Sequence, residues 1–285
     1  MALPDQPPTP PPDPWSETDF APILAFLHHH IGITLEPHRL GLLQARLRSR
    51  LQARSVTSFT QFCERVLKAD PNGPGTQLLI DLSTVNHTSF FREPAHFTLM
   101  TEHVATLWKQ GPASPIRLWS AGCSTGQEPY SMAMAMAEAL PGLSPQRVEI
   151  WASDLSLEVL KTAANAIYHE NEIKGVPAAR LRRFFLRGHG PRNGSYRVVP
   201  EIRDLIKFRH LDLRNAIWAL PTDFHIIFCR NVSIYFAEEE RLILMNRLAQ
   251  HLRPGGWLAM GNGEILSAIP TSLRKCSPSI FGKES

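Results

Sequence analysis

A glycine-rich turn and a later acidic residue are the first features of this 285-residue chain that could do chemistry. The turn, residues 122–126, follows the apolar stretch 116–121, and Asp154 follows the apolar stretch 148–153. Glycines let a backbone approach a ligand closely, and an acid at a strand end can accept hydrogen bonds from both hydroxyls of a ribose. The turn has neither G-x-G-x-x-G spacing nor the Gly-Lys-Ser/Thr of a P-loop. Together they favour a nucleoside ligand without phosphate, for which S-adenosylmethionine is the obvious candidate.

Both features also have a plain structural explanation. A glycine turn is often only a tight turn, and an acid at a strand end is often only the cap of the next helix. The composition is that of an ordinary soluble globular protein, with 43% hydrophobic and 20% charged residues. It excludes chain-wide disorder, a collagen-like repeat and a small disulfide scaffold. The net charge of +4 and the pI near 9.0 permit an acidic partner without identifying one.

The cysteines and the apolar runs indicate a compartment. The chain has four cysteines, and none of them forms a C-x-x-C pair: Cys63, Cys123, Cys229 and Cys276. We therefore expect no metal site and no redox motif, but buried thiols in a reducing compartment. No apolar run approaches the roughly 18 residues of a membrane helix, and no secretory signal pattern is visible. The expected localisation is cytoplasmic, without membrane insertion.

The elements that must position the turn and the acid lie in the second part of the chain. Strands are predicted at 116–121, 148–153, 224–229 and 257–260, helices at 128–140 and 238–252, and a turn at 254–256. Strands that alternate with helices predict the α/β class, with a parallel sheet covered by helices. Ligands of such sheets bind beyond the carboxyl ends of the strands, where the turn and Asp154 are expected.

The N-terminal part has a different character. Seven of the 24 prolines fall within the first 14 residues, which predicts a disordered lead-in or a proline-rich docking ligand. Residues 17–70 predict small helices, and Asp19 is a candidate N-cap just before Pro22. No internal repeat is apparent.

One of these predicted helices has two distinct faces. Its apolar face consists of Leu40, Leu43, Leu47 and Leu51. A basic stripe about 90° around the helix consists of Arg39, Arg46 and Arg50. A charged stripe is often only a solvated face, but no acidic residue occurs between Glu36 and Glu64. The stripe therefore favours docking on an acidic surface.

A second basic run occupies residues 173–200 and also lacks Asp and Glu. Its members are Lys174, Arg180, Arg182, Arg183, Arg187, Arg192 and Arg197. Glycine turns at 188–190 and 193–194 divide it into short predicted strands. These two runs hold much of the positive charge, so the small net charge conceals a local asymmetry.

Four blocks of sequence resemble one family. They are residues 86–93 (NHTSFFRE), 121–131 (AGCSTGQEPYS), 185–198 (FLRGHGPRNGSYRV) and 228–236 (FCRNVSIYF). The chain resembles the bacterial chemotaxis-receptor protein-glutamate O-methyltransferases over about residues 20–285. This resemblance implies transfer of the methyl group of S-adenosylmethionine to glutamates of chemoreceptors, with S-adenosylhomocysteine and a glutamate methyl ester as products.

The resemblance also implies an architecture. It is a small all-α domain followed by a linker and a doubly wound, Rossmann-like S-adenosylmethionine-dependent methyltransferase domain, which carries a small inserted antiparallel β-subdomain. The expected boundaries are 1–16 for a disordered tail, 17–72 for the helical receptor-docking domain, 73–90 for the linker, 91–285 for the catalytic domain and about 181–205 for the insertion.

Roles for individual residues follow from the same resemblance. Arg92 and Tyr235 are the expected catalytic residues, Arg92 beside the cofactor's methionine end and Tyr235 at the end of a loop in the active site. The expected cofactor-binding residues are Asn86, Thr88, Arg92, Ala121, Gly122, Glu128, Asp154, Asp212, Leu213, Arg230 and Asn231. Arg39, Arg46 and Arg50 are expected to dock the acidic methylation helices of the receptor. In some family members the β-subdomain also holds a tethering peptide at the receptor's C-terminus.

The chain departs from the family pattern at three places. Gln127 replaces the first of two consecutive glutamates, Asp212 replaces a common asparagine, and residues 261–264 (GNGE) replace a Gly-His-Ser-Glu-like stretch. The second change removes a hydrogen-bond donor beside the adenine. We expect these changes to tune affinity and to leave the catalytic pair in place.

The reaction needs little from the protein. A glutamate carboxylate is ionised at pH 7 and is already a nucleophile, so positioning and desolvation remain to be supplied. Two other functions stay open: a nucleic-acid methyltransferase, favoured by the basic pI, and a non-catalytic scaffold that senses S-adenosylmethionine. A recognisable nucleic-acid-binding module is missing, and we expect no nucleic-acid partner and a monomeric enzyme.

Overall fold

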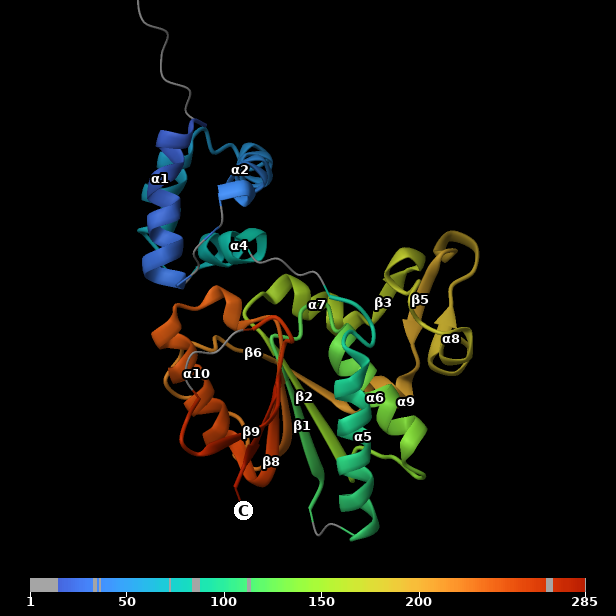
Figure 1. Cartoon of the computed structure of the whole chain (residues 1–285). Helices are drawn as coiled ribbons and strands as arrows, with labels where there is room; N and C mark the ends of the chain where they lie inside the picture. Colours follow the sequence, from blue (N-terminus) through green and yellow to red (C-terminus); the bar gives the residue numbers. More distant parts are fainter. Residues whose placement is uncertain are drawn as a thin grey trace, which may run out of the picture. The chain divides into compact units, whose positions relative to one another are not determined.

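The structure is a computed structural model, drawn in Figure 1. Its chain divides between residues 84 and 85 into two compact units, the helical unit and the catalytic unit. The residues that it describes are 15–32, 35, 37–71, 73–83, 88–111, 114–264 and 269–284.

The helical unit is built from short helices, as the sequence predicts. Helix α1 (Glu17–Phe26) continues as the π-helical turn η1 (Leu27–Ile31), and α3 (Phe59–Phe62) continues as η2 (Cys63–Leu67). Between them lies α2 (Pro37–Gln52), the predicted two-faced helix. Three leucines of the predicted apolar face are buried, together with aromatic residues of α1 and α3: Leu43, Leu47, Leu51, Phe20 and Phe59.

Two local predictions for this unit need correction. Ser16, not Asp19, is the N-cap of α1, since its hydroxyl accepts the Asp19 N–H at 3.2 Å. The Asp19 carboxylate instead accepts the Phe59 N–H at 2.9 Å, at the beginning of α3. Residues within the expected linker form helix α4 (Pro74–Ser83), because their apolar side chains pack against α2 and the π-helical turns.

The catalytic unit contains a seven-stranded sheet in the order β6-β2-β1-β7-β8-β10-β9. The first five of these strands run parallel, and β10 is antiparallel to both of its neighbours. The bounds are β1 Ile116–Ala121, β2 Val148–Asp154, β6 Ile206–His210, β7 Phe224–Cys229, β8 Leu252–Met260, β9 Leu273–Ser277 and β10 Ile280–Lys283. The chain passes from β1 to β2 on one side and β7 lies on the other, so the strand order reverses at β1. The predicted doubly wound class is confirmed.

Helices cover both faces of this sheet. Successive side chains of a strand point to opposite faces, so each face contributes to its own hydrophobic core. Ile226 and Phe228 face the core that contains α5 (Pro94–Lys109) and α6 (Gln127–Ala139). Ile227 faces the core that contains α10 (Glu238–His251). Figure 1 shows α5 and α6 on one side of the strands and α10 on the other. Helix α7 (Leu157–Asn165) follows β2 and contacts β2 and β6.

The predicted turn at 254–256 is wrong, because these residues lie inside β8. The pairing of β8 with β7 shifts its register there, opposite Phe224 and Ile226. A Cβ at Gly256 would lie only 2.9 Å from the His225 carbonyl oxygen. Gly256 therefore serves a close backbone approach within the strand instead of a chain reversal.

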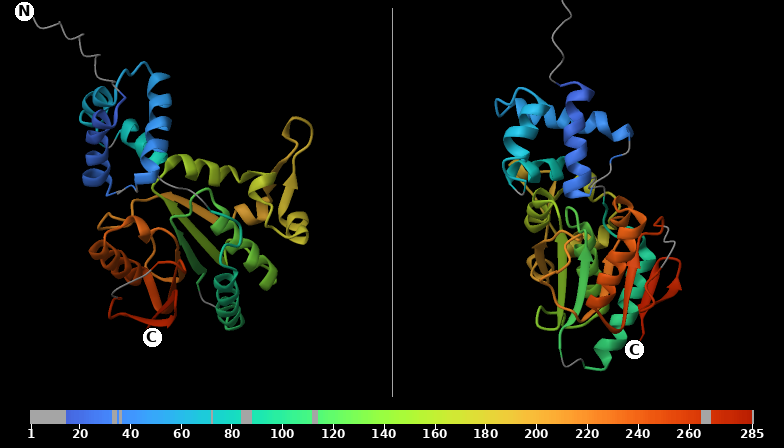
Figure 2. Two further views of the ribbon diagram at one scale, coloured as in Figure 1. Left: turned by 45° about the horizontal axis from the view of Figure 1, so that its top comes forward. Right: turned by 90° about the vertical axis from the view of Figure 1, so that its left-hand side faces the viewer.

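A small antiparallel sheet is inserted after α7. It has the order β3-β5-β4, with β3 Ile167–His169, β4 Phe185–Arg187 and β5 Ser195–Val198. Helix α8 (Ala178–Phe184) precedes β4, and α9 (Pro200–Arg203) follows β5. The first strand precedes the range 181–205 that was expected for the insertion. In Figure 2 the small sheet, coloured yellow, stands out to one side of the catalytic unit.

Part of the second basic run anchors this insertion. Arg180 forms a bidentate ion pair with Glu138 of α6 at 2.7–2.8 Å, and its guanidinium lies over the Phe91 ring. Arg183 donates to the Ala137 carbonyl oxygen at 2.8 Å. These two arginines are used within the catalytic unit, so the surface available to an acidic partner is smaller than the sequence indicates.

The cysteines are free, but not all of them are buried. Three are buried, whereas Cys276 is exposed on the edge strand β9, which corrects the expectation of four buried thiols. Within the described ranges, none of the helices has the length and apolar character that crossing a membrane requires.

Candidate functional site

The glycine turn lies where the sequence predicts, at the carboxyl end of β1 beside that of β2. The N–H groups of Gly122 and Cys123 both donate to the Ser153 carbonyl oxygen, at 2.8 and 2.9 Å. Gly122 has a φ of 81°, and a Cβ there would lie 2.3 Å from Cγ2 of Val232 in the loop after β7. Gly122 is therefore required both for the turn and for the close approach of a second loop.

Asp154 is tied to this turn. Its carboxylate accepts the Ser124 N–H at 2.8 Å and the Ser156 N–H at 3.0 Å. Ser156 is the N-cap of α7, since its hydroxyl accepts the Val159 N–H. The plain explanation of Asp154 as the helix cap is thus not supported. The acid lies at the end of β2, beside the turn, as a ribose ligand would require.

Glu128, at the beginning of α6, and Arg230, just after β7, form a buried pair. Oε2 of Glu128 lies 3.6 Å from Nε of Arg230, and Oε1 accepts the Ser120 hydroxyl at 2.7 Å. Only 2% of the Arg230 side chain and 14% of the Glu128 side chain are exposed. Burial raises the pKa of Glu128, and Arg230 and Ser120 act in the opposite direction by stabilising the carboxylate.

Arg230 has a second acidic neighbour. Glu93 lies 3.6 Å from its Nη2 and 3.4 Å from Nδ1 of His96. Nη2 also donates to the Arg92 carbonyl oxygen, which fixes the segment before α5. Burial lowers the pKa of His96, and the positive charge of Arg230 lowers it further. The nearby Glu93 carboxylate acts in the opposite direction on the pKa of His96 and is the smallest of the three effects.

Several buried atoms of this cluster make no hydrogen bond to the described residues: Nε and Nη1 of Arg230, Oε2 of Glu93 and Nδ1 of His96. Such groups are costly when left unpaired. Both signs of charge are present, on Arg230 and on Glu128. A ligand with an ammonium and a carboxylate, such as the amino-acid end of S-adenosylmethionine, fits this donor and acceptor set.

Asp212 and Leu213 follow β6, whose end pairs with the end of β2. The Leu211 N–H donates to the Asp154 carbonyl oxygen at 3.0 Å, which brings this segment to the same edge of the sheet. The Asp212 carboxylate accepts both the backbone N–H of Arg214, at 2.8 Å, and its guanidinium. Leu213 is buried among the side chains of the α10 core. The acid that replaces asparagine is therefore satisfied by an arginine two residues later.

Some expected site residues lie outside what the structure describes. Asn86 is outside the described residues, and of Arg39 and Tyr235 only the backbone is described. Arg39 lies in α2, and Tyr235 ends the short helix η5 (Ser233–Tyr235). Thr88 is half-buried, shortly before α5.

Three residues of this edge were missed from the sequence. Ser120 binds Glu128, Glu93 faces Arg230, and the Glu264 carboxylate accepts the N–H groups of the loop after β7. Glu93 and Glu264 occur in stretches quoted for the resemblance, but nothing in their spacing announces these contacts.

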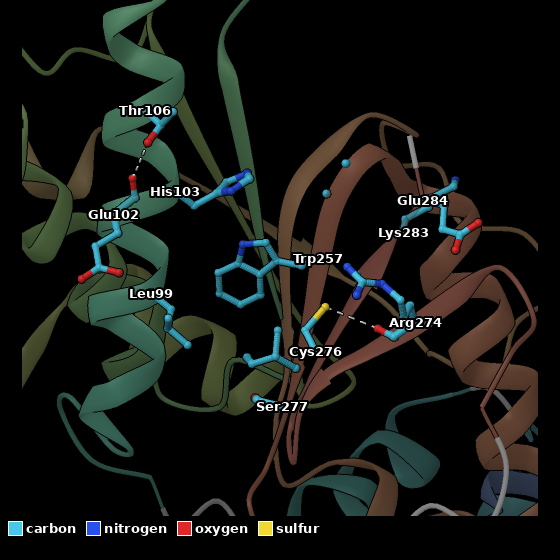
Figure 3. A pocket seen from close by; sticks show the side chains of 14 residues that line it. Leu99, Glu102, His103, Thr106, Trp257, Arg274, Cys276, Ser277, Lys283 and Glu284 are labelled. Atoms are coloured by element: carbon cyan, nitrogen blue, oxygen red, sulfur yellow. Dashed lines mark hydrogen bonds between the residues drawn. The ribbon is translucent and has the colours of Figure 1, made fainter.

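A separate cavity of about 750 Å³ lies between α5 and strands β8–β10. Figure 3 shows Trp257 between His103 of α5 and Cys276 of β9. None of the expected cofactor residues lines it. The residues that line this cavity come from α5, from strands β8, β9 and β10 and from the position just after β10, and none of them belongs to the glycine turn.

Comparisons with known proteins agree with this geometry. The family model described as CheR methyltransferase, SAM binding domain, matches residues 86–281, and the CheR methyltransferase all-alpha domain matches residues 18–81. A chemotaxis protein methyltransferase of Klebsiella aerogenes is 35% identical over 269 residues, which cover 94% of this chain and 90% of that protein. One of Salmonella typhimurium is 36% identical over 254 residues, covering 89% of this chain and 86% of that protein.

The two matched regions correspond to the helical unit and to the catalytic unit, and together they span most of the chain. The relatives are matched over most of their own length. The predicted family, enzyme class and cofactor are confirmed. The chain belongs to the CheR methyltransferase family and is an S-adenosylmethionine-dependent methyltransferase.

Proposed function

We propose that the protein transfers the methyl group of S-adenosylmethionine to glutamate side chains of chemoreceptors and so forms glutamate 5-O-methyl esters. The observation that carries this proposal is the buried Glu128–Arg230 pair at the carboxyl ends of β1 and β7, in a chain whose relatives are named chemotaxis protein methyltransferases. The alternatives of a nucleic-acid methyltransferase and of a sensing scaffold are not favoured by these relatives.

The cofactor is proposed to lie along the edge formed by β6, β2, β1 and β7. Asp154 would bind the ribose, Glu128 and Arg230 the amino-acid portion, and the segment at Asp212 the adenine. The residues proposed for cofactor binding are Asn86, Thr88, Arg92, Ala121, Gly122, Glu128, Asp154, Asp212, Leu213, Arg230 and Asn231. The unpaired buried atoms of Arg230 support this placement, because a carboxylate could satisfy them.

The protein's part in the reaction is positioning. When bound, S-adenosylmethionine supplies an electrophilic methyl group on its sulfonium. Arg92 orients the acceptor carboxylate loosely, since full pairing would blunt its nucleophilicity, and Tyr235 makes one hydrogen bond near the transferred methyl. The burial of Glu128 and Arg230 excludes water from the amino-acid end, which strengthens the interactions there. No general base is needed, because the acceptor glutamate is ionised at neutral pH.

Receptor docking is proposed for the helical unit, which includes α4 and gives way to the catalytic unit after residue 84. Arg46 and Arg50 of α2 are exposed, and so is Leu42, at 56%. Arg39 would extend the same stripe. A basic face with an apolar residue in it complements an acidic amphipathic methylation helix and raises the rate of encounter.

Two finer proposals concern the partners. The free edge of β4 could receive a receptor's C-terminal tethering peptide as an added strand, since β4 pairs only with β5 among the described strands. We also propose that the enzyme acts as a monomer. The reaction would take place in the cytoplasm, where the exposed thiol of Cys276 stays reduced.

A methyl-release assay tests the proposed function. The protein is incubated with radiolabelled S-adenosylmethionine and receptor cytoplasmic fragments and then treated with alkali. Volatile labelled methanol is the expected result, because only a carboxyl methyl ester releases it. Label incorporated into DNA or RNA when it replaces the receptor, or cofactor binding without any volatile label from the receptor, would overturn the assignment in favour of one of the alternatives.

The same assay tests the two catalytic residues. Arg92→Ala and Tyr235→Phe are expected to lower methyl transfer by at least about tenfold while cofactor binding changes less, because Tyr235 acts on the acceptor side and Arg92 contacts the acceptor as well as the cofactor's methionine end. Calorimetric binding of S-adenosylhomocysteine gives the second quantity. Turnover within about twofold of wild type for both variants would contradict the roles proposed here.

A further inference from the structure

The loop after β7, residues 230–236, carries three of the residues proposed for cofactor binding and reaction: Arg230, Asn231 and Tyr235. We call it the active-site loop. Asn231 has a φ of 60°, in the left-handed region, which asparagine adopts more readily than most other non-glycine residues. The side chain of Val232 leans on the Cα of Gly122, since a Cβ there would meet it at 2.3 Å. The loop's position therefore determines how closely it covers the glycine turn.

One carboxylate from a distant part of the chain holds this loop. Oε2 of Glu264 accepts the Asn231 N–H at 3.0 Å, and Oε1 accepts the Ser233 N–H at 2.8 Å. Oε1 also accepts the Ser233 hydroxyl at 2.7 Å, and Oε2 accepts the N–H of Gly261. Hydrogen bonds to a charged acceptor are stronger than neutral ones, and both oxygens of Glu264 are fully engaged.

The turn that presents Glu264 is built for this contact. The Glu264 N–H donates to the Gly261 carbonyl oxygen at 3.0 Å, so residues 261–264 form a closed turn after β8. A Cβ at Gly261 would lie 2.7 Å from Nδ2 of Asn231 and 2.9 Å from Oε2 of Glu264. The glycine thus allows the turn to touch the active-site loop.

A positive charge holds the opposite side of the same loop. Nε of Arg241, in the first turns of α10, donates to the Ser233 carbonyl oxygen at 3.0 Å and to the Phe236 carbonyl oxygen at 2.9 Å. Glu264 therefore binds N–H groups of the loop, while Arg241 binds its carbonyl groups. Two side chains of opposite charge thus bind the donors and the acceptors of the backbone in one short segment.

We propose that Glu264 and Arg241 are positioning residues for methyl transfer, which hold the active-site loop over the glycine turn without touching cofactor or acceptor. This inference rests on the proposed function, because it concerns the same site. Glu264 holds the left-handed backbone conformation of Asn231 and the position of Val232 against Gly122. Arg241 fixes the end of the loop that carries Tyr235.

The test compares two carboxylates that accept backbone N–H groups. Glu264→Gln replaces an acceptor oxygen with an NH₂ group that faces N–H donors. The matched control is Glu240→Gln, since Glu240 accepts the Ala237 N–H at 2.9 Å just beyond the active-site loop. We expect Glu264→Gln to lower kcat about 10- to 100-fold per bound site, at saturating S-adenosylmethionine, and Glu240→Gln to leave kcat within about twofold. Calorimetric stoichiometry for S-adenosylhomocysteine counts the competent sites.

A second measurement distinguishes a positioning role of Glu264 from an effect on folding, and it does not depend on which substrate is methylated. Amide hydrogen exchange of Asn231 and Ser233, with S-adenosylhomocysteine bound, should accelerate more than about tenfold in Glu264→Gln and not in Glu240→Gln. This readout stands even if the wild type releases no methanol, in which case the proposed substrate fails while the positioning role is still judged. Should Glu264→Gln not fold, Ser233→Ala removes one of the four hydrogen bonds and should lower kcat about two- to fivefold. Unchanged exchange, or a kcat per bound site within twofold of wild type, overturns the proposal.

Discussion

The two ends of the parallel sheet both carry clusters of charged residues, and they satisfy those charges differently. At the amino end, Arg117 of β1 pairs with Glu149 of β2 at 3.0 Å and with Asp223 before β7. Lys207 of β6 reaches the second oxygen of Glu149 at 2.7 Å. These pairs are short and partly exposed, and none of their buried atoms is left without a hydrogen bond among the described residues.

At the carboxyl end the distances are longer and the burial is deeper. Arg230 lies 3.6 Å from both Glu128 and Glu93, and two of its nitrogens make no hydrogen bond to described residues. A cluster evolved only for stability would close these contacts, because unpaired buried polar groups destabilise the fold. The difference indicates that the ion pairs at the amino end stabilise the sheet, whereas the charged groups at the carboxyl end are available to bind a ligand.

The largest expected effect comes from removing the central cation at each end. Arg230→Met leaves two mostly buried carboxylates without a counter-charge and should lower the free energy of unfolding by about 3–5 kcal/mol. Arg117→Met breaks partly exposed pairs and should cost only about 1 kcal/mol. Urea unfolding measures both, and binding of S-adenosylhomocysteine should be lost only in Arg230→Met. Equal losses of stability would show that the two clusters do not differ as described.

A milder pair of substitutions sharpens the comparison through binding. Glu128→Gln keeps an acceptor for Ser120 but removes the charge, and we expect the Kd for S-adenosylhomocysteine to rise about 10- to 100-fold, since hydrogen bonds to charged groups contribute about 1.5–3 kcal/mol. Glu149→Gln should leave this Kd within about twofold and lower stability by about 1 kcal/mol. Isothermal calorimetry and urea unfolding give the two numbers for each variant. A Kd that rises equally in both variants would contradict the assignment of the carboxyl end.

The amino end also predicts a dependence of stability on pH. Burial, reinforced by the positive charge of Arg253, lowers the pKa of His225 to about 4, although Asp223 opposes the shift. Because the unfolded chain takes up this proton near pH 6.5, the stabilisation is complete above that pH and is lost as the pH falls towards 4. The expected loss between pH 7 and pH 5 is about 2 kcal/mol.

Urea unfolding of the wild type and of His225→Gln at both pH values isolates this contribution, since other groups titrate alike in the two proteins. Subtraction of the two pH dependences should leave the loss due to His225. Parallel pH dependences would mean that this histidine titrates normally in the folded protein.

The sequence and the structure agree best where a local pattern determines the outcome. Strands β1, β2 and β7 and the position of Asp154 follow from apolar runs and from the turn after them. The predicted turn at 254–256 failed because a tertiary contact with β7, not the local propensity of Pro and Gly, decides its conformation. The prediction of Asp19 as an N-cap failed for a similar reason, since the N–H group that its carboxylate binds belongs to Phe59, 40 residues away.

Contacts between residues distant in sequence limited the prediction of the site as well. Its glycine turn has a local signal, whereas Glu93 and Glu264 act through partners 137 and 31–33 residues distant. Sequence spacing carries no information on such pairs until the sheet order is known. The switch of strand order at β1 brings Glu128 and Arg230 together, and this topology could be expected only through the resemblance.

The smallest effect is expected at Asp212, where the chain departs from the family's common asparagine. Its carboxylate accepts the backbone N–H and the guanidinium of Arg214, so the acid is engaged within its own loop and its missing donor is not replaced there. Asp212→Asn would break a partly exposed ion pair, at a cost of less than about 1 kcal/mol, while it restores a donor beside the proposed adenine site. We expect the Kd for S-adenosylhomocysteine to change by no more than about threefold in calorimetry. A change above tenfold would mean that the Asp212–Arg214 pair itself determines the affinity for the nucleoside part of the ligand. The carboxyl end of the sheet would then depend on bound ligand near Asp212 as well as near Arg230.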